Sequence, residues 1–246
     1  MNICSFFFGL TLVILFSGIH SATLTVKNNC PYTIWPATQT GGVGAAQLSN
    51  TGFELVSQNS ATLDTPASWS SGKLWARTQC SSDSSGSFTC ATANCGSGQV
   101  ECNGAGEVPP ASLAEFTLGS ADGTDTYDIS LVNGFNLPVS ITPQGGSGQN
   151  CTTTNCGVDI NADCPSDLAI KDSNGSIIGC KSACAAFNEP QYCCTGTYNS
   201  PDTCKATNYS MFFKNKCPQA YSFAYDDHSS TFSCTGSPNY LITFCP

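Results

Sequence analysis

Few residue types in this 246-residue chain could support catalysis, and carboxylates are the main candidates. The chain has two histidines, and His20 lies in an apolar leader, so a Ser-His-Asp triad would have to use His228. His228 follows Asp226 and Asp227 in a polar run that is typical of an exposed turn rather than of a triad. We find no phosphate-binding loop and no dinucleotide fingerprint, so we expect no cofactor. We also expect no metal, because the cysteines that could bind one are expected to be paired.

Glu115 and Asp128 are the acidic residues that stand out, because each interrupts an apolar, strand-like run. Glycoside hydrolysis needs two carboxyl groups roughly 5 to 10 Å apart, one acting as acid and the other as base or nucleophile. A groove lined by carboxylates could instead bind sugar hydroxyls without turnover. Both residues would also fit on the solvent face of a sheet, where most acidic side chains lie.

The first 21 residues resemble a signal peptide, with an apolar core over residues 6–16 and cleavage expected after Ser21. Of the 17 cysteines, only Cys4 lies in this leader, which leaves sixteen. An even and dense set of cysteines in a secreted chain predicts eight disulfides. Such pairing leaves no thiolate for nucleophilic catalysis or zinc binding. We therefore expect a secreted, extracellular protein with no integral membrane segment after processing.

The charge balance also excludes one class of partner. The chain has 17 acidic and 8 basic residues, a net charge of -9. Nucleic-acid binding relies on clustered lysines and arginines, which this chain lacks. We expect a soluble monomer.

Short alternating segments separated by Gly, Pro, Ser and Asn predict a mainly β fold. Asn133-Gly134 lies between two such runs and predicts a tight hairpin from 127–132 to 135–142. Only 182–187 and 208–215 have patterns that suit short helices. The other expected strands cover residues 23–27, 33–36, 52–57, 73–78, 113–118, 221–225 and 240–244.

Two stretches, Cys80 to Cys102 and Cys151 to Cys217, are rich in cysteine and lack alternation. We interpret both as disulfide-held regions inserted into the sheet framework rather than as independent domains.

Several motifs together resemble the thaumatin-like, pathogenesis-related proteins of plants. The stretch from Gly86 to Cys102 resembles the signature of that family, with Asn94 at the usual aspartate position. The sixteen cysteines also fit the number and order found in the family. Further matches are Asn29-Cys-Pro-Tyr-Thr-Ile-Trp35, Leu74-Trp-Ala-Arg-Thr78, Pro109 to Phe116, Gln191-Tyr-Cys-Cys194 and Asn239 to Pro246.

The resemblance implies a flattened β-sandwich core with two disulfide-rich loop regions and short helices. The core would comprise 22–77, 111–157 and 218–246, the small disulfide-rich region 78–110, and the larger one 158–217. The implied disulfides are Cys30–Cys245, Cys80–Cys90, Cys95–Cys102, Cys151–Cys234, Cys156–Cys217, Cys164–Cys180, Cys184–Cys193 and Cys194–Cys204.

Antifungal members of the family carry an acidic cleft, whose residues would fall here on Lys73, Glu115, Asp128, Asn133 and Asp226, with Asp227 as the alternative to Asp226. Two positions depart from the family pattern. Lys73 replaces an arginine and loses its planar fork. Asn133 replaces an aspartate, which should make the cleft less acidic.

Two functions follow from the resemblance. The first is a plant defence protein that is antifungal because it binds cell-wall β-1,3-glucan in this cleft. The second is a weak endo-β-1,3-glucanase, with Glu115 as general acid and Asp128 or Asp226 as base or nucleophile. The sequence pI near 4.3 argues against the strongly basic, sweet-tasting members.

Among three sequons, at Asn150, Asn174 and Asn208, the turn-like setting of Asn174 makes it the expected glycosylation site.

Overall fold

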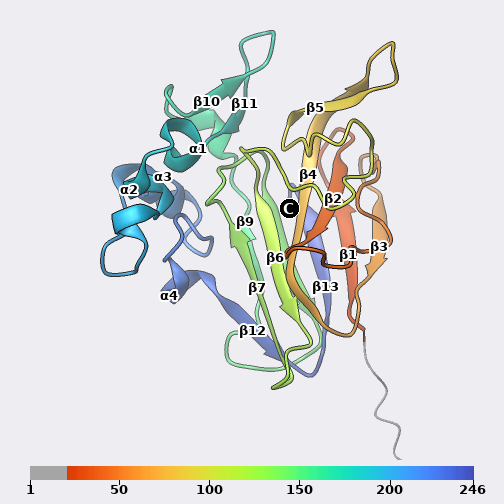
Figure 1. Cartoon of the computed structure of the whole chain (residues 1–246). Helices are drawn as coiled ribbons and strands as arrows, with labels where there is room; N and C mark the ends of the chain where they lie inside the picture. Colours follow the sequence, from red (N-terminus) through yellow and green to blue (C-terminus); the bar gives the residue numbers. More distant parts are fainter. Residues whose placement is uncertain (1–20) are drawn as a thin grey trace, which may run out of the picture.

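The computed structural model describes residues 21–246, so the expected signal peptide lies almost wholly outside the described residues. The predicted fold class is confirmed: two β-sheets pack face to face, and disulfide-rich segments extend from them (Figure 1). One sheet has the order β3 (Ser60–Asp64), β1 (Thr23–Asn28), β13 (Asn239–Phe244), β8 (Val139–Gln144) and β9 (Thr154–Cys156). The other has the order β12 (Phe232–Thr235), β7 (Thr124–Ser130), β6 (Leu113–Leu118), β4 (Trp69–Ser82) and β2 (Trp35–Thr40), and β5 (Phe88–Thr92) pairs with β4.

Alternation of side chains builds the core between the sheets. Strand β1 buries every second residue, including Leu24 and Val26, as a half-buried strand requires. The rings of Phe116 and Tyr127 pack against Tyr240 of the opposite sheet, with ring centroids 5.4 and 5.3 Å apart. Each such pair contributes about 0.5 to 1.5 kcal/mol beyond the area that it buries.

The two ends of the described chain are joined at the centre of one sheet. Strands β1 and β13 pair in parallel, with Leu24 opposite Tyr240. The Cys30–Cys245 disulfide links the same two segments, which are 215 positions apart in the sequence.

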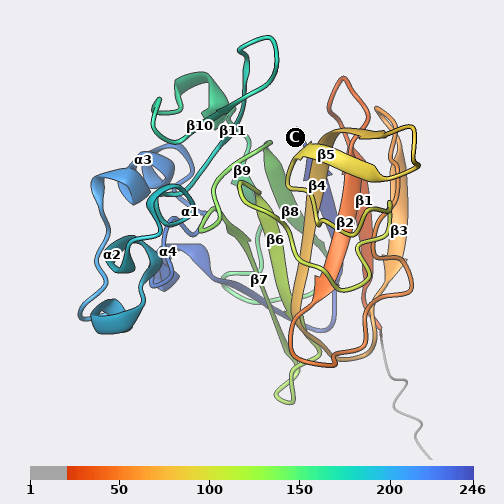
Figure 2. The ribbon, with the colours of Figure 1, turned by 45° about the horizontal axis from the view of Figure 1, so that its top comes forward.

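A helical region lies beside the sandwich and includes the hairpin of β10 (Ala169–Lys171) and β11 (Ile177–Cys180) (Figures 1 and 2). Ser182 caps α1 (Ala183–Phe187), and Thr207 forms a capping box on α3 (Asn208–Lys216). These caps satisfy backbone N–H groups that helices this short would otherwise leave unpaired. The other short helices are η1 (Ile160–Asp163), α2 (Pro190–Cys193), η2 (Gly196–Tyr198) and α4 (Asp227–Ser230). No helix within residues 21–246 is long and apolar enough to cross a membrane.

The predicted hairpin at Asn133-Gly134 is wrong. Strands β7 and β8 lie in different sheets, so the chain turns here to cross from one sheet to the other. Gly134 has a φ of 94°, whereas Asn133 is not among the residues with positive φ. A Cβ on Gly134 would lie 2.4 Å from the carbonyl oxygen of Cys180, so the glycine is required by close backbone packing.

Two other predicted strands, 52–57 and 221–225, are loops that make only isolated bridges, at Gly52, Leu55 and Tyr221. Leu55 is buried, whereas Val56 is exposed, so the first of these segments is anchored by single side chains rather than by a continuous ladder.

Eight disulfides occur in the described chain, and they join the cysteines in the pairs that the family resemblance implied. Five close loops with a sequence separation of at most 16 residues, and three join segments more than 60 residues apart. The first group fixes local loops, and the second ties distant strands and the helical region to the sandwich.

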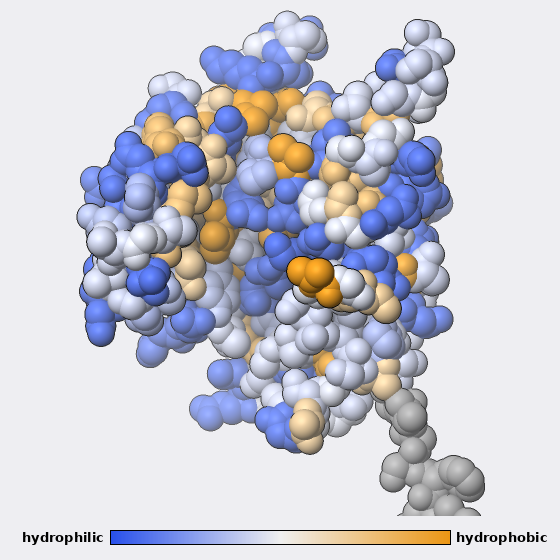
Figure 3. All heavy atoms as spheres, in the orientation of Figure 1, coloured by the Kyte–Doolittle hydropathy of each residue, from blue (hydrophilic) through white to orange (hydrophobic). Residues whose placement is uncertain are grey.

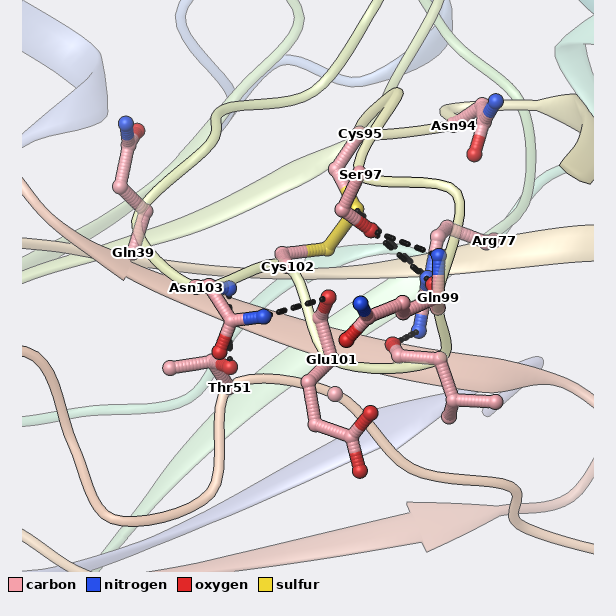
Figure 4. The surroundings of a disulfide bond; sticks show 12 residues. Gln39, Thr51, Arg77, Asn94, Cys95, Ser97, Gln99, Glu101, Cys102 and Asn103 are labelled. Atoms are coloured by element: carbon pink, nitrogen blue, oxygen red, sulfur yellow. Dashed lines mark hydrogen bonds between the residues drawn. A yellow bond between two sulfur atoms is a disulfide. The ribbon is translucent and has the colours of Figure 1, made fainter. Parts of the chain in front are cut away.

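The segment around Cys95–Cys102 is organised by a buried arginine (Figure 4). Arg77 is fully buried, donates to the carbonyl oxygens of Trp35 and Val100 at 3.1 and 2.6 Å, and lies 5.3 Å from the ring centre of Phe88. Burial lowers the pKa of Arg77 to about 10, so the group remains cationic at neutral pH. Part of the stretch that resembles the family signature, residues 86–102, therefore surrounds the charged side chain of Arg77.

Candidate functional site

The predicted cleft residues Lys73, Glu115 and Asp128 form a row across three adjacent strands. Lys73 of β4 lies directly opposite Glu115 of β6, and Glu115 lies opposite Asp128 of β7. Directly opposed residues point to the same face of a sheet, with Cβ atoms roughly 4.5 to 5.5 Å apart. The strand register therefore brings the two carboxyl groups and the ammonium group together.

This row lies on the floor of an open cleft of about 430 Å³. In Figure 3, hydrophilic residues gather over this part of the sheet, beside a furrow toward the helical region. Asn133, Tyr221 and Asp227 line the wall on that side.

A second hollow, of about 350 Å³, continues the cleft along the strands. It shares Lys73, Glu115 and Asp128 with the first and extends past Thr117 and Thr126. The row therefore crosses the middle of an elongated groove that follows the strand direction.

Glu107, which the sequence analysis missed, is buried and contacts two residues that line the cleft, Lys73 and Asn133. Its side chain is only 3% exposed, and its Oε1 lies 3.7 Å from Lys73 Nζ and accepts a 2.5 Å hydrogen bond from Asn133 Nδ2. This contact gives a physical reason for asparagine at position 133, since an ionised aspartate would set a second carboxylate against Glu107. Glu107 lies in an irregular loop with no sequence pattern that could have singled it out.

Lys73 also lies 3.9 Å from Glu115 Oε1, so it is shared between two carboxylates. Burial raises the pKa of Glu115, Lys73 opposes this shift, and Glu107 adds to it. Burial also raises the pKa of Asp128, to about 8, with further contributions from Glu115 and Asp227. Asp128 Oδ1 is buried and receives no hydrogen bond from the described chain. The acidic proton of the pair is therefore held preferentially by Asp128.

The adjacent residues Asp226 and Asp227 have different surroundings. Asp226 Oδ2 pairs with Lys214 Nζ at 2.9 Å and accepts hydrogen bonds from the N–H and hydroxyl of Ser222. Asp227 lines the cleft, and its Oδ1 accepts a 2.8 Å hydrogen bond from the hydroxyl of Tyr221. The structure thus brings Asp227, rather than Asp226, to the carboxylate row.

The geometry defines a class: a disulfide-rich β-sandwich with an elongated acidic groove across one sheet. The Thaumatin family model matches residues 28–246. The chain belongs to the thaumatin family.

Two curated relatives resemble it over almost their full length. A thaumatin-like protein 1 of Pyrus pyrifolia is 59% identical over 240 residues, which cover 97% of each chain. A protein of Prunus avium named glucan endo-1,3-beta-glucosidase is 59% identical over 238 residues, 96% of each chain.

Among solved structures, the fold is similar to that of a glycoside hydrolase family 64 laminaripentaose-producing β-1,3-glucanase from Paenibacillus barengoltzii. The match has a TM-score of 0.50 at 12% identity and covers 91% of this chain and 74% of that one. At this identity the likeness concerns the fold alone. The family and the many disulfides are consistent with secretion.

Proposed function

We propose that this protein is a secreted plant defence protein that binds β-1,3-glucan of fungal cell walls in the acidic groove. The observation that carries the proposal is the row of Lys73, Glu115 and Asp128 across the floor of an elongated groove. A groove that follows the strands suits an extended polymer better than a single small molecule, because polar side chains continue on both sides of the row.

The charge of the groove favours a neutral polysaccharide. Lys73 is the only basic residue lining the two hollows in the described chain, and Glu107 and Glu115 both lie within 4 Å of it. Asp227 adds another carboxylate at the wall. Phosphorylated or uronic-acid polymers would be repelled, whereas sugar hydroxyls can donate to these oxygens.

A second candidate function is weak endo-β-1,3-glucanase activity, which the name of the Prunus avium relative favours. The paired carboxyl groups of Glu115 and Asp128 supply the required groups. Because the proton is held preferentially by Asp128, we assign the roles in the opposite order to the sequence-based expectation. Asp128 would protonate the leaving glycosidic oxygen, and Glu115 would act as base toward water or as nucleophile at the anomeric carbon.

Retention on insoluble β-1,3-glucan and reducing-end release from soluble glucan test the two functions together. We expect retention of the wild-type protein without reducing ends. Glu115→Gln should weaken retention by about tenfold or more, since hydrogen bonds to a charged group contribute roughly 1.5 to 3 kcal/mol. Asp128→Asn should change retention little, because it replaces a neutral acid by a neutral amide.

Asp202→Asn, which removes an exposed carboxylate outside the groove, is the matched control and should behave like the wild type. Wild-type protein that is folded yet not retained on glucan would refute the binding proposal. Reducing-end release that disappears in both Glu115→Gln and Asp128→Asn, but not in Asp202→Asn, would establish the enzyme instead.

A further inference from the structure

A second cavity, of about 600 Å³, lies apart from the acidic groove and shares no lining residue with it. One wall is the β11 segment Ile177 and Ile178, and the facing wall comes from the sandwich at Thr78, Gln79 and Leu137. Figure 2 shows the region where the β10–β11 hairpin faces the ends of β4 and β5, with the C-terminus between them. The volume is within the range of about 300 to 1,000 Å³ that is typical of small-molecule sites.

The lining of this cavity combines an apolar wall with a few hydrogen-bond acceptors. Ile177, Ile178, Leu137 and Pro138 supply aliphatic surface, and Ile177 and Ile178 remain partly exposed. Tyr32, at 48% exposure, adds an aromatic ring at the edge.

The acceptors lie at the base of η1. Asn161 is 9% exposed, and its Nδ2 donates to the carbonyl oxygen of Asn136 at 3.0 Å. Its Oδ1 is buried and receives no hydrogen bond from the described chain. Asp159 also lines the cavity. The pKa of Tyr32 is raised mainly by burial and, to a smaller extent, by the negative charge of Asp159. Asp159 is exposed, and its Oδ1 accepts a 3.1 Å hydrogen bond from the N–H of Asn161. The Asp159 carboxylate can also accept from a ligand hydroxyl, whereas Asn161 Oδ1 is closed off from the cavity.

Disulfides hold the walls of this cavity in place. Cys245 itself lines it and is bonded to Cys30, and Cys180, two residues after Ile178, is bonded to Cys164. Cys80, next to Gln79, is bonded to Cys90. The lining is thus largely preformed, which reduces the ordering cost of binding a ligand.

We infer that this cavity is a second binding site, for a neutral, hydroxylated aromatic molecule of the phenolic class. An aromatic ring would lie against the Ile177–Ile178 wall and near Tyr32, and its hydroxyl groups would donate to the Asp159 carboxylate. No lysine, arginine or histidine of residues 21–246 lines the cavity, and Asp159 would repel an anion. A saccharide is less well matched, because the aliphatic wall offers no partner for hydroxyl groups on that face.

The inference is tested with (+)-catechin as the probe, on the disulfide-bonded protein purified from a secreting host. Calorimetric titration measures the Kd, and amide chemical shifts of isotope-labelled protein locate the bound probe. We expect catechin to bind the wild type and Glu115→Gln equally, because the acidic groove is not involved. Ile178→Asn should raise the Kd at least about tenfold, and Tyr32→Ala about two- to tenfold.

Chemical-shift changes on adding catechin that are confined to the amides of residues 177–179 and of Gln79 would support the site even if one variant fails to fold. The inference is overturned if catechin does not bind, if its binding is lost in Glu115→Gln, or if the shifts lie along the acidic groove. Laminaripentaose that shifts the 177–179 amides and displaces catechin would assign the cavity to a saccharide and overturn the phenolic assignment.

Discussion

Asp128→Asn should change how the stability of the protein depends on pH. Asp128 has an ordinary pKa of 3.8 and a pKa of about 8 in the folded protein, because ionisation would place a poorly solvated charge beside Glu115 and Asp227. Between these two values the folded state binds a proton that the unfolded state has lost. The free energy of unfolding therefore falls as pH rises through this window.

The size of the effect follows from the width of the window. Each pH unit corresponds to about 1.4 kcal/mol, so raising pH from about 5 to about 8 would cost the wild type at most roughly 4 kcal/mol through this group. Solvent on the open side of the groove screens the charge, which leaves an expected effect of roughly 2 to 4 kcal/mol. Asp128→Asn cannot ionise and should lack this contribution.

Guanidinium unfolding with the disulfides intact, followed by fluorescence of the buried Trp69 and Trp75, measures the effect. The stability of Asp128→Asn relative to wild type should increase by roughly 2 to 4 kcal/mol from pH 5 to pH 8. Asp202→Asn should follow the wild-type profile, since it is exposed and outside the groove. Parallel profiles for Asp128→Asn and wild type, within about 0.5 kcal/mol, would refute the assignment of a raised pKa to Asp128.

Two further predictions concern sites outside the groove. Arg77→Leu should lower the free energy of unfolding by roughly 2 to 5 kcal/mol, because the carbonyl oxygens of Trp35 and Val100 lose their charged donor; an unchanged unfolding midpoint at neutral pH would contradict the role given to this arginine. Asn174 is exposed in the turn between β10 and β11, where Asp172 Oδ1 accepts from its N–H, so protein from a glycosylating plant host should carry a glycan there. Mass spectrometry should show the glycan in the wild type and not in Asn174→Gln, and unmodified Asn174 in the wild-type protein would rule this out.

The sequence predicted most clearly the elements that carry their own local signal. Strand β6 occupies the expected residues 113–118 because its alternation matches a half-buried strand, and α3 begins at the expected Asn208 behind a capping threonine. The hairpin prediction at Asn133-Gly134 was wrong because it used local turn chemistry alone. In the structure Gly134 packs against the backbone of Cys180, and β8 joins the other sheet.

The site was predictable only in part, for a related reason. The strand-like runs singled out Glu115 and Asp128, and the resemblance added Lys73. Their proximity depends on the register of three strands, which local sequence does not encode. Glu107 lies in a loop, and only the three-dimensional path of that loop places it beside Lys73 and Asn133. Asp226 and Asp227 are chemically identical neighbours, and they are distinguished by Lys214 of α3, which pairs with Asp226.

The parallel pairing of β1 with β13 also constrains the order in which the chain can mature during synthesis. Cys245 is translated 215 positions after Cys30, so the first strand must wait for the last one before that sheet is continuous. Meanwhile β1 can pair only with β3, and its other edge is open to non-native strands. Short loops such as Cys95–Cys102 and Cys184–Cys193 can oxidise as soon as they emerge. The sheet is therefore completed only at the end of synthesis, and a chain stalled before β13 would present the exposed edge of β1 to other strands.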